Sequence, residues 1–205
     1  MDKPSWVEPL EESLLLAISL FALITWIGVA LNLLFQEQLY LSAAAVDAAS
    51  SARLDELIGV SGALDQNSIA LAEIFGAVKG EVAAQTLLDA WRGLVADLIQ
   101  YAQGAQSAAR ADLDQRRPVI AAQLSLSSLP QPAADDLVRA RSQTQLSVAD
   151  AIVSRNPTLT AQRLRLAAAA SDELARPLAA ELRRQTGQGR AIRRPPRRLN
   201  LESDV

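Results

Sequence analysis

Carboxylates are the main candidate metal ligands of this protein, because its 205 residues include neither histidine nor cysteine. Oxygen ligands on facing helices can hold a divalent cation when several of them converge. The candidates are Glu37, Glu73, Asp89 and Asp97, but they are spread over three expected helices and lack a Glu-x-x-His spacing. We therefore interpret them as solvated helix faces and expect no bound metal.

Other catalytic groups are also missing from the sequence. Without histidine there is no Ser-His-Asp triad, and without cysteine there is no thiolate zinc site and no disulfide. Neither a phosphate-binding glycine loop nor a G-x-S-x-G elbow occurs. The adjacent pairs Asp135–Asp136 and Asp172–Glu173 are expected to stabilise helix starts rather than to transfer protons. We expect no enzyme and no cofactor.

Trp91 and Tyr101 are the large aromatic residues expected within the folded part. Two interpretations stay open for them. Bulky rings at helical spacing are typical of core packing, whereas aromatic side chains with a polar tip also favour half-wet ligand or partner pockets. Both residues are therefore candidate pocket residues.

The composition predicts an almost wholly helical protein. Half of the residues are apolar but only 4% are aromatic, and the apolar half is mostly alanine and leucine, which favour helices over strands. The expected fold is all-α, with one N-terminal transmembrane helix that continues into an antiparallel bundle of four to six helices. The expected divisions are a flank at 1–12, a membrane helix at 13–35, the bundle at 36–185 and a disordered tail at 186–205.

Residues 13–35 contain no charged side chain. At ~1.5 Å per residue this segment would span about 35 Å, enough for a hydrocarbon core of ~30 Å. A cleaved signal peptide is the alternative, but its apolar region is usually ~7–15 residues long and follows basic residues. Here Glu8, Glu11 and Glu12 precede the segment. We expect an uncleaved single-pass anchor.

Small and polar residues lie along one face of this segment. Ala22, Thr25, Gly28 and Asn32 follow one another at spacings of three, three and four, which allows close packing of a second membrane helix. Asn32 could equally meet lipid headgroups. Lys3 and the α-amino group precede the segment, and no basic residue follows it until Arg53. The positive-inside rule then predicts a cytoplasmic N-terminus and an extracytoplasmic bundle in the plasma membrane.

Glycine and proline divide the remaining chain into helices. We expect the membrane helix to continue over 36–58 and to end at Gly59 and Gly62, with Asp65 in the first turn of the next helix. The further helices are expected at 64–78, 81–103, 106–126, 133–154 and 158–184, with Pro118 and Pro177 as bends. An offset of 49 residues superposes Leu64-Asp65-Gln66 on Leu113-Asp114-Gln115, which suggests an internal duplication of a helical hairpin.

Several short motifs occur in a recognisable order. They are Leu64-Asp65-Gln66-Asn67-Ser68-Ile69-Ala70-Leu71-Ala72, Ile74-Phe75-Gly76, Trp91-Arg92, Tyr101 and Ala175-Arg176-Pro177-Leu178-Ala179. Over residues 35–185 the chain resembles bacterial secreted or lipid-anchored helical-bundle proteins that are often labelled copper amine oxidase-like. The resemblance implies an extracytoplasmic helical bundle. That family carries histidines where this chain has Gln38, Leu94, Arg141 and Ala170, so the resemblance does not extend to an imidazole metal site or an oxidase activity.

The net charge of −3 hides an asymmetry. The last 23 residues carry seven basic and two acidic side chains, whereas the preceding 182 have a net charge of −8. The basic tail includes Arg190, Arg193, Arg194, Arg197 and Arg198. A solvated, disordered end is one interpretation. The other is an arm that binds anionic lipid headgroups or another acidic surface. With the tail outside the cell, we expect no nucleic-acid partner.

These features together predict a non-enzymatic, single-pass membrane protein. Its extracytoplasmic bundle is expected to act as an accessory or interaction subunit of a membrane assembly, with the lipid bilayer and a membrane protein as partners. The alternative is a sensor ectodomain that binds a small ligand or ion without histidine ligands.

Overall fold

The described residues of the computed structural model form six helices. The structure describes the backbone of residues 7–127 and 129–187, and the side chains of 29–127 and 129–184. The helices are α1 (Val7–Ser50), α2 (Leu54–Lys79), α3 (Glu81–Ala102), α4 (Gln106–Leu124), α5 (Gln131–Val153) and α6 (Pro157–Gly187). The prediction of an all-α bundle is confirmed.

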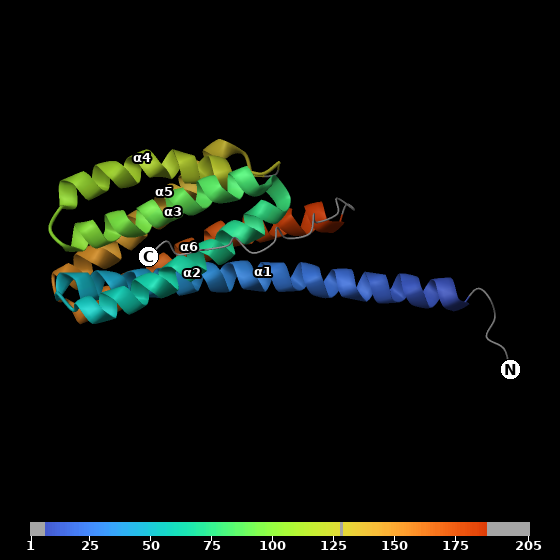
Figure 1. Ribbon diagram of the computed structural model, residues 1–205, viewed down its shortest axis with the longest axis horizontal. Coiled ribbons are helices and arrows are strands. Elements are labelled where there is room, and N and C mark those ends of the chain that lie inside the picture. The colour runs from blue at the N-terminus through green and yellow to red at the C-terminus, as the bar shows by residue number, and fades with distance from the viewer. Residues whose placement is uncertain (1–6, 128, 188–205) are drawn as a thin grey trace, which may run out of the picture.

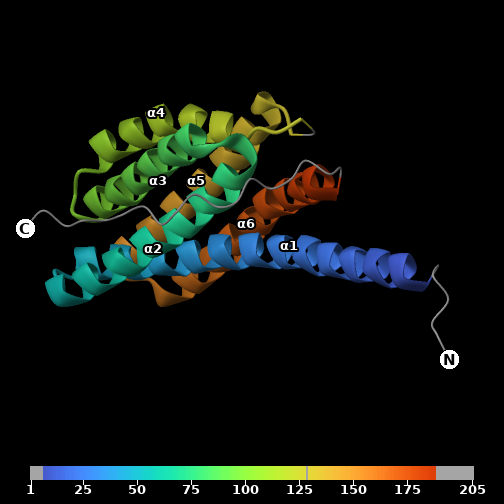
Figure 2. The same cartoon turned by 45° about the vertical axis from the view of Figure 1, so that its right-hand side comes forward.

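The six helices form a closed ring, and three of them also contact one another across its centre. Each helix packs against the next one in the chain, and α6 packs back against α1. In addition α1, α3 and α5 contact one another, so these three helices surround the centre of the bundle, while α2, α4 and α6 each bridge two of them. Figure 1 and Figure 2 show this arrangement, with the N-terminal part of α1 extending beyond the other helices.

Apolar side chains from all six helices fill the core. The largest fully buried members are Trp91, Tyr101, Phe35 and Phe75. Buried alanines such as Ala109, Ala121, Ala134 and Ala149 accompany them, and these small side chains let neighbouring helices lie close together. The alanine-rich composition therefore specifies close helix packing as well as helix formation.

The first helix ends earlier than the sequence predicts. α1 ends at Ser50, and Ala52 adopts a left-handed conformation with φ 55°. The amide of Arg53 donates to the carbonyl of Ala48 at 2.9 Å, which closes the helix end. The predicted stop at Gly59 and Gly62 is wrong, because both residues lie inside α2.

The end of the expected membrane segment belongs to the bundle. Leu31 and Phe35 are fully buried in the core cluster. Nearby, Gln36 Nε2 donates to Asp172 Oδ1 of α6 at 2.7 Å, and Asn67 Nδ2 of α2 donates to the Leu34 carbonyl at 3.0 Å. The packed core of the bundle therefore already includes residue 31, whereas the sequence analysis places the start of the bundle at residue 36.

Most of the expected membrane segment lies outside the described side chains, which begin at residue 29. A search of the described part of the chain finds no helix with the length and apolar character needed to cross a membrane. Ala22, Thr25 and Gly28 fall in the part whose side chains are not described, whereas Asn32 is exposed on α1.

The later helices begin and end close to the glycine and asparagine residues that mark their predicted boundaries. Gly80 separates α2 from α3 with φ 94°, and Gly104 follows α3 with φ 103°, conformations that favour glycine. Asn156 caps α6 by accepting a hydrogen bond from the Leu159 amide at 3.0 Å. Pro118 and Pro177 lie inside α4 and α6, which continue past them.

The positions matched by the 49-residue offset are equivalent in the structure. Leu64, Leu71 and Phe75 of α2 are buried, as are the matched residues of α4, Leu113, Ile120 and Leu124. α2 therefore resembles α4 in which of these positions face the core, whereas the match between α3 and α5 is weaker, because Leu88 is buried and Leu137 is only partly buried. Asp65 does not lie in a first helical turn, because α2 begins eleven residues earlier, at Leu54. Its carboxylate instead pairs with Arg92 of α3, with Nε–Oδ1 at 2.6 Å and Nη2–Oδ2 at 3.0 Å.

Candidate functional site

The two candidate pocket residues lie in separate surroundings. Trp91 and Tyr101 are both buried on α3, but ten residues of helix place them about 15 Å apart along its axis. The Trp91 ring packs against Phe35 of α1, with centroids 5.7 Å apart. Tyr101 reaches α4 and α5 instead. The structure therefore does not bring them together in one pocket.

Tyr101 is part of a polar contact at the edge of the core. Its hydroxyl donates to Asp150 Oδ1 of α5 and accepts from Arg110 Nη2 of α4 at 2.6 Å. The Arg110 guanidinium also lies 5.0 Å from the centre of the ring. Burial and the hydrogen bond to Asp150 raise the pKa of Tyr101. The phenol therefore stays protonated and joins three helices.

A buried arginine lies where α1, α3 and α5 meet. Arg141 of α5 is 2% exposed. Its Nη2 donates to Gln38 Oε1 of α1, and its Nη1 donates to Gln145 Oε1 at 3.2 Å. The ring centroids of Phe35 and Trp91 lie 5.3 Å and 5.4 Å from its guanidinium carbon. We call Gln38, Ser42, Trp91, Arg141 and Gln145 the interior polar cluster.

The guanidinium has no acidic partner among the described residues. Its hydrogen-bond acceptors are two neutral amides, and no carboxylate lies within ion-pairing distance of it. Burial alone lowers the pKa of Arg141 to about 9, which still leaves the side chain charged at neutral pH. Uncompensated buried charge is costly and therefore unusual in a core. The aromatic rings and the two amides offset part of that cost.

The same cluster contains unpaired hydrogen-bond donors. Gln38 Nε2, Gln145 Nε2, Trp91 Nε1 and Arg141 Nε are buried without a partner, as is Ser42 Oγ. The amide orientations are fixed by chemistry, because Arg141 can only donate and thus requires the oxygen of each glutamine. Both amide nitrogens are left over as donors. The centre of the bundle therefore combines a positive charge with an excess of N–H groups.

A small cavity adjoins this cluster. It has a volume of about 10 Å³ and lies between α1, α3 and α5. Ser42 and Gln145 of the interior polar cluster form part of its wall, and the remaining wall is apolar, from Leu39, Ala43, Val46, Leu98, Val148 and Ala149. This volume is about that of one water-sized guest. The two polar wall residues carry the unpaired Ser42 Oγ and Gln145 Nε2.

Of the four candidate metal-ligating acids, one lies in an unexpected place. Glu37, Glu73 and Asp89 are exposed, but Asp97 is buried. Its carboxylate accepts from Arg116 Nε of α4 at 2.7 Å. Burial raises the pKa of Asp97 despite the arginine. The interpretation of Asp97 as a solvated residue is therefore wrong, whereas in the described part of the chain no group of three potential ligands is placed to hold a metal.

Glycine makes the Asp97–Arg116 contact possible. A Cβ at Gly93 would lie 2.1 Å from Arg116 Nη1, so the guanidinium occupies space that any larger side chain would take. In the sequence this glycine sits in the middle of a helix, where it costs about 0.5–1 kcal/mol relative to alanine. The structure thus gives it a packing role.

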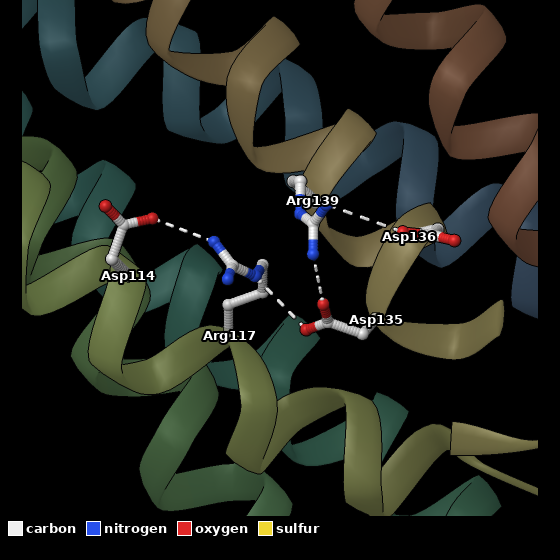
Figure 3. Close-up of polar contacts among 5 residues, drawn as sticks. All are labelled: Asp114, Arg117, Asp135, Asp136 and Arg139. Atoms are coloured by element: carbon white, nitrogen blue, oxygen red, sulfur yellow. Dashed lines mark hydrogen bonds and ion pairs between the residues drawn. The ribbon is translucent and has the colours of Figure 1, made fainter. Parts of the chain in front are cut away.

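Charged residues also join α4 to α5 at the surface. Arg117 pairs with Asp114 at 2.8 Å on its own helix and with Asp135 at 3.1 Å on α5, while Arg139 pairs with Asp135 at 2.7 Å and Asp136 at 3.5 Å (Figure 3). Burial opposes ionisation of Asp135, but the two arginines outweigh it and lower its pKa. The pair Asp135–Asp136 does not stabilise the start of α5 as expected, because the first turn of α5 contains no acidic residue; both carboxylates pair with arginines instead.

The interior polar cluster is the part of the site that the sequence analysis missed as a unit. The signal was present in α5, whose buried residues Ala134, Val138, Arg141, Gln145 and Val148 recur at three and four. An arginine and a glutamine therefore occupy core positions of an apolar stripe. The basic tail residues, Arg190 to Arg198, lie outside the described residues.

Comparison with known proteins identifies no relative. No protein-family profile matches the chain, and neither a curated protein nor a solved structure shows significant similarity to it. Of the four positions at which the resemblance implies histidine, Gln38 and Arg141 contact each other, Leu94 is buried in the core and Ala170 is partly buried.

Proposed function

We propose that the protein is a non-enzymatic, single-pass membrane protein whose extracytoplasmic helical bundle is an accessory or interaction subunit of a membrane assembly. One observation carries the proposal. On α1 the side chains of Val29, Leu33 and Tyr40 are 54%, 62% and 55% exposed. Their spacings of four and seven place them on one face of the helix. We call them the α1 stripe.

The α1 stripe is continuous with the apolar segment that precedes it in the sequence. Because Leu31 and Phe35 pack in the bundle, the segment available to lipid is 13–30, which at ~1.5 Å per residue spans about 27 Å. This length is at the lower end of what crosses a bilayer. An exposed apolar face that emerges from such an anchor is suited to a second membrane protein lying against the same helix.

The charges support the same arrangement. Lys3 precedes the apolar segment and the first basic residue beyond it is Arg53, which favours a cytoplasmic N-terminus and an extracytoplasmic bundle. The arginine tail would then face anionic headgroups or another acidic surface on the outside. In this arrangement the lipid bilayer and a membrane protein are the partners, and nucleic acid is not one.

Site-specific photocross-linking tests the interaction role. A photoreactive amino acid at Leu33 should yield one discrete adduct with a membrane protein in native membranes. The matched control is Leu166 of α6, which is also an exposed leucine, at 53%, but lies on a different helix. Equal adducts from both positions, or no adduct from Leu33, would contradict the proposal.

A second function is favoured by a different observation. The interior polar cluster, with its buried charge and unpaired donors, is an arrangement that a small ligand could complete. It supports the alternative of an ectodomain that senses a small ligand or ion without histidine ligands. Membrane attachment is compatible with both functions.

A further inference from the structure

A polar groove lies between α3 and α4 on the surface of the bundle. It has a volume of about 440 Å³, which is in the range of pockets that hold a small ligand. We propose that this groove is the docking site for the arginine-rich C-terminal segment of the chain, residues 188–205. The inference goes beyond the proposed function and requires neither membrane attachment nor a protein partner.

Small side chains on α3 leave the groove open. Thr86, Ala90 and Gly93 follow one another at spacings of four and three, which places them on one face of the helix. Thr86 and Ala90 line the groove together with Arg116 of α4. The Arg116 guanidinium occupies the space beside Gly93 and pairs there with buried Asp97 at 2.7 Å. The α3 wall therefore leaves room for the side chains of a docked segment.

Two carboxylates in the groove have no basic partner. Asp89 of α3 and Asp112 of α4 both line it. Asp89 accepts a hydrogen bond from Gln85 Nε2 at 2.9 Å, and among the described residues neither Asp89 nor Asp112 forms an ion pair. The positive charge of Arg116 is balanced by Asp97. The groove therefore has two uncompensated negative charges, one on each wall.

Arginine is well suited to such walls. Its guanidinium can form two parallel hydrogen bonds to one carboxylate, and it is more weakly hydrated than the ammonium group of lysine. The C-terminal segment has five arginines between positions 190 and 198, with no acidic residue among them. Val119 is 41% exposed in the groove and offers an apolar surface to the methylene groups of an arginine side chain. The groove and the segment are therefore complementary in charge and in chemistry.

The segment begins close enough to reach the groove. α6 ends at the end of the bundle at which α3 begins (Figure 1, Figure 2). Near the end of α6, Arg184 Nη2 donates to Ser127 Oγ at 3.3 Å, and Ser127 lies three residues beyond the end of α4. Val119 lies five residues before that end, which is about 8 Å along the helix. Six residues lead from Gly187 to Arg193, and an extended chain of that length spans about 20 Å. The arginines can therefore reach the groove while the described helices keep their positions.

Docking would give the basic tail a second partner besides lipid. An arginine that pairs with Asp89 or Asp112 is not free to bind an anionic headgroup. The bundle and the membrane would therefore compete for the same segment, and docking would withhold the tail from the lipid surface.

Disulfide cross-linking of the full-length protein in a neutral detergent tests the proposal. The natural chain has no cysteine, so Val119→Cys and Ile192→Cys place one thiol in the groove and one in the segment. Under a mild oxidant the pair should form an intramolecular disulfide, seen as a faster-migrating monomer on a non-reducing gel. Sodium chloride at about 1 M should slow its formation, because salt screens the attraction between exposed charges. Absence of this disulfide, or a covalent dimer in its place, would overturn the proposal.

Charge variants show whether the groove carboxylates hold the segment. Asp89→Asn with Asp112→Asn keeps the shape of both side chains and removes both charges, and it should slow disulfide formation roughly three- to tenfold. The matched control, Asp55→Asn with Glu73→Gln, makes the same charge change at two exposed acids of α2 and should leave the rate unchanged. Equal rates in the two double variants would mean that the segment meets the groove only by random motion and would overturn the proposal. That outcome would leave the membrane-interaction proposal intact, since that proposal is tested by cross-linking at Leu33.

Discussion

The hydrogen bond between Gln38 and Arg141 can be measured by a double-mutant cycle. The cycle uses Gln38→Leu, Arg141→Met and the double variant. Leucine and methionine approximate the replaced side chains in volume and neither can form the hydrogen bond. Both residues are buried and lie on different helices, α1 and α5, which are 103 positions apart in the chain. The cycle therefore reports a tertiary contact and no local helix effect.

The structure sets the expected magnitude. A net hydrogen bond to a charged group is worth about 1.5–3 kcal/mol, and Gln38 Oε1 is one of only two acceptors that Arg141 has among the described residues. Gln38→Leu removes this bond and also removes one unpaired amide nitrogen, which offsets part of the loss. The single variants are thus less informative than their coupling, which should be about 1.5–3 kcal/mol.

Urea unfolding of the full-length protein in a mild detergent, followed by circular dichroism, supplies the four free energies. Gln143→Leu is the matched control, because Gln143 is exposed on α5. Its cycle with Arg141→Met should be additive within about 0.5 kcal/mol. If Gln38 and Arg141 were also additive within this range, the charged hydrogen bond at the centre of the bundle would be refuted.

The surroundings of Gly93, Gly59, Lys79 and Asp135 each predict the effect of a substitution. Gly93→Ala should weaken the contact of Arg116 with its buried carboxylate, a loss of about 1.5–3 kcal/mol that the helix gain of about 0.5–1 kcal/mol offsets only in part. Gly59→Ala, in open space within α2, has only the helix gain and should stabilise the protein by about 0.5–1 kcal/mol. Urea unfolding distinguishes the two. Lys79→Met should destabilise by about 1–3 kcal/mol and speed hydrogen exchange in the last turn of α4, since Lys79 Nζ donates to three carbonyls there, at 3.0, 2.7 and 3.0 Å. The fold lowers the pKa of Asp135, so its ion pairs stabilise the protein above the unfolded pKa of about 3.8, and this stabilisation is lost as the pH falls below that value. Asp135→Asn should therefore flatten the acid limb of a plot of unfolding free energy against pH. An unchanged acid limb would contradict this prediction.

The four later helices could be read from the sequence because glycine, proline and asparagine mark their ends. The glycine at residue 80 has a positive φ, and Asn156 caps the helix that follows it. The end of the first helix carries no such mark. Ala52 adopts φ 55°, a conformation that costs alanine about 1–2 kcal/mol. The turn is exposed and is closed by local backbone hydrogen bonds, such as that from the Arg53 amide to the Ala48 carbonyl at 2.9 Å, and neither glycine nor proline marks it in the sequence.

Burial was harder to predict than helix positions. Asp97 is a charged residue in a helix, and a solvated place was the natural expectation. Its burial depends on an arginine 19 positions away and on the absence of a side chain at Gly93. The inclusion of residue 31 in the bundle core is hard to predict for a related reason. Leu31 and Phe35 are as apolar as residues in lipid, and only the contacts of α1 with the other helices reveal that they belong to the bundle.

The candidate site shows the same limit of sequence reasoning. In the sequence, Gln38 and Arg141 stand out only singly, at positions where the resemblance implies histidine. Their relation could not be seen, because it depends on the meeting of α1, α3 and α5. The spacing of three and four residues in α5 is the feature of the sequence that indicates burial of Arg141, because it places this arginine in a stripe of core positions. The function of such a residue follows from its unpaired neighbours, which sequence spacing does not supply.

Cysteine labelling across the membrane tests the central proposal most directly. The natural chain has no cysteine, so a single one can be introduced at exposed Asp136 of the bundle or at Ser5 before the apolar segment. In spheroplasts, a membrane-impermeant maleimide should label Asp136→Cys, and it should label Ser5→Cys only after lysis. Protection of Asp136→Cys until lysis, or release of the protein from membranes by alkaline carbonate, would contradict the anchored, extracytoplasmic bundle.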